Sequence, residues 1–111
     1  EYFMRKFIRH GDVNFHEVEE TDGEIVKHTG FFIVARGEAT GSTHTLTVER
    51  PSDLIIKQNK DGRMYFDLLA SGVITHTHDH EPITIQPGKY IQIAEREVDH
   101  FADSVVRQVV D

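Results

Sequence analysis

Short stretches of alternating or β-branched residues recur about every ten residues along the chain, and turn-forming residues separate them. The separators are Asp-Gly, Pro-Gly and small-residue sequences, which favour tight turns. Strands of this length and spacing are typical of a small all-β domain, so we predict a β-barrel or β-sandwich. The predicted strands cover residues 13–16, 31–35, 44–48, 54–56, 64–69, 73–80, 83–85 and 90–94.

Within these strands the pattern also predicts which side chains face the core. Leu46 and Val48 alternate with threonines, so these two residues and His44 should share the inward face of one strand. The continuous apolar run at residues 31–35 predicts a strand that is buried on both faces. The sequence Asn-Lys-Asp-Gly at residues 59–62 predicts a hairpin turn.

The two ends of the chain lie outside this regular pattern. We interpret residues 1–3, which precede Met4, as additions to the natural protein, and we expect a single β domain over residues 4–111. Near the C-terminus, residues 99–110 fit either a helix or a closing strand, because apolar residues lie four apart there. We therefore expect at most one short C-terminal helix.

Charge and cysteine content argue against several classes of protein. The chain has 12 Lys and Arg against 19 Asp and Glu, a net charge of -7, whereas binding to nucleic acid or anionic lipid depends on basic residues. It contains no apolar stretch of about 20 residues, which a membrane span needs, and residues 1–10 lack the apolar centre of a signal peptide. We therefore expect a cytoplasmic protein. The absence of cysteine excludes disulfides and thiolate metal sites.

Eight histidines stand out, and three of them alternate along one predicted strand. His76, His78 and His80 should face the same side, with successive residues about 7 Å apart. Neutral imidazole binds zinc, iron, nickel and copper, so we predict a site for a divalent transition metal. His44, which should face the core from another strand, is the predicted third ligand. Glu81 is predicted either to add a carboxylate or to orient one of the histidines.

Two other interpretations of these histidines remain open. A strand end rich in histidine, threonine and aspartate is often a solvated polar face, and His44 can be a core histidine bonded to a carbonyl group. If the site is catalytic, the ion acts as a Lewis acid or activates water, and Glu81 acts as the general base.

Several short motifs follow one another in an order that resembles a family of short uncharacterised bacterial and phage proteins. The resemblance covers nearly the whole chain from Met4, and it implies a common fold and a phage or prophage context without implying an activity. Ser42 stands where that family often has its first histidine, and the spacing from His76 to His80 is four instead of three. The motifs are Arg9-His10-Gly11-Asp12-Val13, Gly37-Glu38-Ala39-Thr40-Gly41 followed by His44, His80-Glu81-Pro82-Ile83, Pro87-Gly88-Lys89-Tyr90 and Arg96-Glu97.

A weaker resemblance links the histidine region to the first motif of the cupins. Gly72, His76, His78, Glu81 and Gly88 follow the cupin order, although two intervals are shorter. This resemblance implies a small β-barrel whose mouth is lined by histidines.

The sequence therefore supports two functions of different classes. In the first, a small β domain binds a divalent transition metal or a small polar ligand through its histidine cluster. In the second, a non-catalytic module encoded by a phage or prophage binds and inhibits a host protein. The acidic surface around Glu17, Glu19 and Glu20 would suit a basic partner. An edge strand of so small a domain would also allow two copies to form a homodimer.

Overall fold

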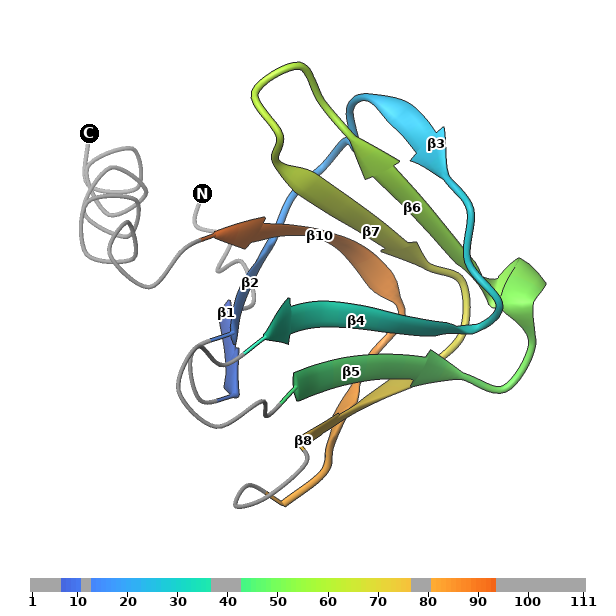
Figure 1. Cartoon of the computed structure of the whole chain (residues 1–111). Helices are drawn as coiled ribbons and strands as arrows, with labels where there is room; N and C mark the ends of the chain where they lie inside the picture. The colour runs from blue at the N-terminus through green and yellow to red at the C-terminus, as the bar shows by residue number, and fades with distance from the viewer. Residues whose placement is uncertain (1–6, 11–12, 37–42, 77–80, 94–111) are drawn as a thin grey trace, which may run out of the picture.

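The chain folds into two antiparallel β-sheets that face each other (Figure 1). The computed structural model describes residues 7–10, 13–36, 43–76 and 81–93. The six-stranded sheet has the order β1 (Phe7–His10), β2 (Val13–Glu17), β10 (Gly88–Ile93), β7 (Met64–Leu68), β6 (Leu54–Gln58) and β3 (Glu24–Val26). The four-stranded sheet has the order β4 (Phe31–Arg36), β5 (Thr43–Val48), β8 (Gly72–His76) and β9 (Ile83–Ile85). A short 3₁₀ turn, η1 (Pro51–Asp53), joins β5 to β6.

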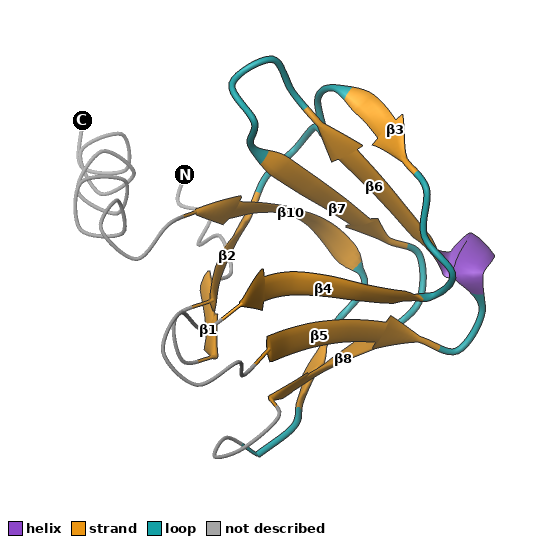
Figure 2. Ribbon diagram, in the orientation of Figure 1, coloured by secondary structure: helices purple, strands orange, loops and turns teal. Residues whose placement is uncertain are grey.

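Each sheet has an edge strand on both sides, so the fold is a β-sandwich and not a closed barrel (Figure 2). The edge strands are β1 and β3 in the larger sheet and β4 and β9 in the smaller one. The prediction of an all-β fold is confirmed, and of the two predicted architectures, barrel and sandwich, the structure shows the sandwich.

Inward-facing side chains of both sheets form the core. Phe15 of β2 and Phe66 of β7 meet edge to face with ring centroids 5.4 Å apart, and Phe32 of β4 approaches Phe66 from the other sheet at 6.1 Å. Burying an apolar side chain of this size contributes about 1.5–3 kcal/mol. The core also contains Val13, Leu46, Val48, Leu54, Ile56, Leu68, Ile74, Ile85 and Tyr90. The predicted inward face of residues 44–48 is therefore confirmed.

The turn between β6 and β7 forms the hairpin that the sequence predicts. The Asn59 side-chain oxygen accepts hydrogen bonds from the backbone N–H groups of Asp61 and Arg63, at 3.0 and 2.9 Å. The Gly62 N–H donates to the Asn59 carbonyl at 3.0 Å, and Gly62 has a φ of 85°. An asparagine that bonds to its own turn and a glycine with positive φ together close a tight connection.

The strand at residues 31–35 forms, but the prediction that it is buried on both faces is wrong. β4 is an edge strand, and Phe31 is 57% exposed on its outward face. A continuous apolar run does not distinguish a central strand from an edge strand, because strand pairing sets that position.

β1 and β3 were not predicted from the sequence. Both are short, and Ile25 at the centre of β3 is 72% exposed, so β3 has no buried–polar alternation.

Some predictions fall on residues that the structure does not describe. They are the turn at residues 37–42, the strand end at residues 77–80 and the helix or strand at residues 99–110. Across the part of the chain that is described, no helix is long and apolar enough to cross a membrane.

Candidate functional site

His44 and His76 lie side by side on neighbouring strands of the smaller sheet. They are directly paired in the β5–β8 register, and their ring centroids are 4.4 Å apart with the rings tilted by 55°. His44 is 5% exposed and His76 is half-buried. The prediction that His44 lies on a strand beside the histidine cluster is therefore confirmed for His76.

Strand alternation places both imidazoles on the inner face of the sandwich. His44 continues the inward series of β5, and His76 follows Ile74, which pairs with Leu46 in the adjacent row of the core. β5 begins and β8 ends at the same end of the sandwich, where β4 and β10 also end (Figure 1). The two rings thus form the last described inward-facing pair at this end of β5 and β8.

Gln92 brings a polar group from the opposite sheet to this end. Its side-chain amide donates a hydrogen bond to the Val34 carbonyl at 2.7 Å, which links β10 to β4 across the sandwich. The Val34 carbonyl is available because a β-bulge shifts the register between Ile33 and Ala35. Ala35 in turn pairs with His44. Gln92 is the polar residue between two isoleucines of β10, and this pattern alone does not predict its bond to the opposite sheet.

Two imidazoles this close can direct one ring nitrogen each toward the same ion. Zinc binds histidine nitrogens at about 2.0–2.1 Å, usually with four ligands in all. Within the described ranges, no three His, Cys, Asp or Glu residues are grouped so that they could hold a metal. His44, His76 and Glu81 thus do not form such a group, and Glu81 is exposed before β9. His78 and His80 lie outside the described residues.

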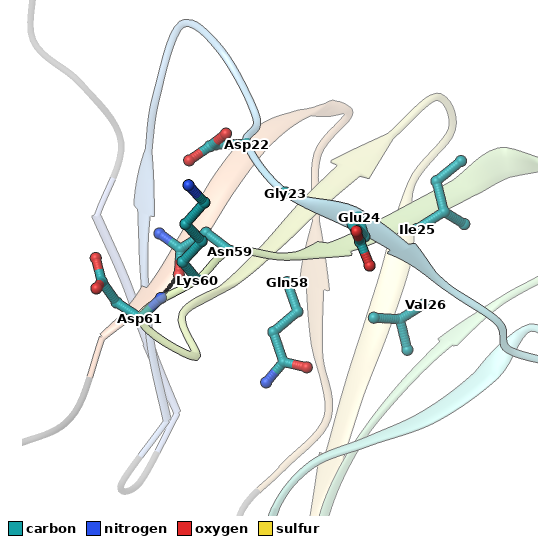
Figure 3. A pocket seen from close by; sticks show the side chains of 9 residues that line it. All are labelled: Asp22, Gly23, Glu24, Ile25, Val26, Gln58, Asn59, Lys60 and Asp61. Atoms are coloured by element: carbon teal, nitrogen blue, oxygen red, sulfur yellow. Dashed lines mark hydrogen bonds between the residues drawn. The ribbon is translucent and has the colours of Figure 1, made fainter.

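A second candidate site is a groove of about 850 Å³ at the β3 edge of the larger sheet (Figure 3). One wall is formed by residues 22–26 and the other by residues 58–61. Three carboxylates line the groove, those of Asp22, Glu24 and Asp61, together with one lysine. The chain that leads into the groove is also acidic, because residues 17–20 include three glutamates, of which the last two are exposed.

His28 has a structural role that the sequence analysis missed. Its Nδ1 accepts a hydrogen bond from the Gly30 N–H at 2.9 Å, so that nitrogen carries no proton. The proton of the neutral ring is then on Nε2, which donates to the Leu54 carbonyl at 2.6 Å. The ring therefore fixes the segment before β4 to the start of β6.

Tyr90 combines burial with a nearby negative charge. Its side chain is 1% exposed, and its hydroxyl donates to the Gln86 carbonyl at 2.8 Å. Burial raises the pKa of Tyr90 above the ordinary value of 10.0, and the negative charge of Glu17 raises it further. Both effects favour the neutral phenol in the folded protein.

Residues 9–94 match the model of one protein family, which is described as a domain of unknown function (DUF8820). No curated protein and no solved structure matches the chain. The expectation of an uncharacterised family is therefore supported, while the phage context and the cupin likeness stay predictions.

Proposed function

We propose that this chain, which belongs to the DUF8820 family, is a small cytoplasmic protein that binds a divalent transition metal ion through His44 and His76. The observation that carries the proposal is the directly paired, inward-facing position of the two rings, with centroids 4.4 Å apart. The proposed metals are zinc, iron, nickel and copper, because neutral imidazole suits all four.

Burial of His44 favours this proposal over a solvated polar face. The ring is 5% exposed, on the face that carries Leu46 and Ile74. Burying a polar ring costs free energy that a bonding partner offsets, and a metal ion shared with His76 is a partner of that kind.

The remaining ligands are proposed from the sequence after β8. His78 and His80 follow His76 closely, and the ion needs ligands besides the two described rings. If the bound ion activates a water molecule or polarises a small polar ligand, Glu81 is the proposed general base.

Zinc titration of tag-free protein by calorimetry tests the proposal. His44→Gln and His76→Gln should each weaken zinc binding by more than about tenfold, because each removes a nitrogen ligand. His28→Gln is the matched control, since His28 is bonded at another place in the fold, and its zinc affinity should equal that of the wild type. Melting curves of the three variants check that each is folded. Equal zinc affinity in all three variants would contradict the proposal, as would the absence of binding in the wild type.

The acidic groove favours a second candidate function, a non-catalytic module that binds a basic segment of a host protein. Carboxylates on both walls of the groove would attract lysine and arginine side chains. Binding of a Lys/Arg-rich peptide should weaken with salt and should be lost in an Asp22→Asn, Glu24→Gln double variant. Asp67→Asn, on the outward face of β7, is the control that should retain binding. If both variants bind the peptide equally, the groove is not the binding site.

A further inference from the structure

Two side chains that point out of the sandwich from β2 are buried. Val13 and Phe15 belong to the core, so Asn14 and His16, which alternate with them, lie on the outward face of the larger sheet. Asn14 is 0% exposed and His16 is 5% exposed. In a two-layer sandwich the outward side chains of a strand ordinarily meet solvent. Burial this complete requires other atoms over that face.

The neighbouring strand β10 has the same feature. Tyr90 belongs to the core and Gln92 bonds to the other sheet, so Ile91 and Ile93 point outward. These two isoleucines are 5% and 2% exposed, although neither belongs to the core. Because β2 and β10 are paired (Figure 1), their four outward side chains form one continuous surface, which we call the outer patch. It consists of two rows, His16–Ile91 and Asn14–Ile93.

The described strands do not cover the outer patch. All of them belong to the two sheets, and the smaller sheet packs against the inward face of the larger one. The described loops that adjoin β2 and β10, at residues 18–23 and 86–87, leave these strands at the end where Glu17 pairs with Tyr90. Burial is most complete at the other end, at Asn14 and Ile93. The described residues therefore leave the cover of this patch unassigned.

We propose that residues 94–111 cover the outer patch, with the apolar side of a helix against Ile91 and Ile93. This segment continues directly from Ile93, at the end of the patch where burial is most complete. Residues 1–6 instead join β1 at Phe7, which pairs with His16 at the opposite end and is 41% exposed. The position and length of the C-terminal segment thus select it as the occupant.

The sequence of residues 98–110 suits this position. Apolar residues recur there every three or four positions, which places them on one side of a helix. A helix over this range would be about 20 Å long, more than the roughly 14 Å across four neighbouring strands. It would also satisfy its own backbone hydrogen bonds, which a strand laid flat on a sheet face would not. The apolar series is Val98, Phe101, Val105 and Val109, and Asp103 and Arg107 fall on the opposite side.

Through-space contacts measured by nuclear magnetic resonance in the full wild-type chain test the placement directly. We expect contacts from the Phe101 ring and the Val105 methyl groups to the methyl groups of Ile91 and Ile93. Contacts to these isoleucines from residues 1–6 in place of residues 94–111 would overturn the proposal, as would the absence of contacts from residues 94–111.

Thiol reactivity tests the same contact in variants, because the chain contains no cysteine of its own. In Ile91→Cys the new thiol would lie under the helix and should react slowly with a maleimide. Adding Val105→Lys places a charge in the contact and should raise the rate at least about tenfold, since a shift of about 1.4 kcal/mol in docking suffices for that change. Ser104→Lys makes the same change of charge on the solvent side of the helix, so this matched control should leave the rate unchanged.

Circular dichroism of the three cysteine variants separates undocking from unfolding, because the β-sheet signal should stay the same in all of them. Equal rates with Val105→Lys and Ser104→Lys would overturn the proposal, as would fast reaction of Ile91→Cys alone. If Val105→Lys does not fold, the through-space contacts of the wild type decide the question. The proposal is independent of the metal site, since His44 and His76 belong to the smaller sheet.

Discussion

Replacing Gly23 by alanine should separate β3 from the rest of its sheet. Gly23 has a φ of 115°, and a Cβ there would lie 2.2 Å from the Gln58 carbonyl oxygen and 2.6 Å from the Asn59 nitrogen. Both atoms belong to the backbone, so no side-chain rotation relieves the clash. Gly62 is the matched control, because its φ is also positive at 85° but a Cβ there meets nothing within 4 Å.

The structure predicts different magnitudes for the two alanine variants. Gly62→Ala should cost about 1–2 kcal/mol, the cost of left-handed backbone for a residue with a Cβ. Gly23→Ala incurs the same cost and also displaces β3 from β6. The three residues of β3 pair with β6, from Glu24 opposite Gln58 to Val26 opposite Ile56. Lost backbone hydrogen bonds at about 0.5–1.5 kcal/mol each bring the total to about 3–5 kcal/mol.

Urea denaturation followed by circular dichroism measures both variants against the wild type. The free energy of unfolding should fall more in Gly23→Ala than in Gly62→Ala by about 2 kcal/mol or more. Equal losses in the two variants would show that β3 does not depend on the close approach of Gly23 to β6, and would refute the reasoning.

Three further predictions concern Tyr90, His28 and the pH dependence of zinc binding. Because the pKa of Tyr90 is raised by burial and by Glu17, its contribution to stability should be complete below pH 10 and lost as pH rises through the raised pKa. The unfolding free energy of the wild type should therefore fall more steeply above pH 10 than that of Tyr90→Phe, and parallel curves would contradict this. His28→Ala should destabilise the fold by about 1–3 kcal/mol, since two backbone groups lose their partner, and an unchanged melting temperature would argue against the bridge. Zinc affinity should fall as pH drops through about 6.5, where free histidine gains its proton, and equal affinity at pH 7.5 and 5.5 in calorimetry would indicate carboxylate ligands.

The fold class follows from local pattern, because alternation and turn residues act within a few positions. The hairpin at residues 59–62 was predictable for this reason, as Asn59 and Gly62 form it through bonds inside the turn itself. The edge position of β4 was not predictable, since it depends on which strands pair across the whole chain. β3 is held by pairing with β6, about 30 residues away, rather than by its own three residues.

The candidate site likewise has one part that the local sequence predicts and another that depends on long-range packing. The inward direction of His44 follows from its alternation with Leu46, and the structure adds that His76 is its direct partner. Gln92 and His28 bond to backbone groups 58 and 26 residues away. No local spacing signals such contacts, because they arise only when the two sheets and the loops between them have packed.

Nuclear magnetic resonance of the imidazole nitrogens tests the central claim most directly. The signals of the eight histidines are recorded before and after one equivalent of zinc, and those of His44, His76 and His28 are assigned from the three glutamine variants. We expect both of these residues to shift to metal-bound positions at one equivalent, while the His28 signal stays unchanged. Unchanged signals from His44 and His76, or a gradual shift of all eight histidines only at large zinc excess, would contradict the account.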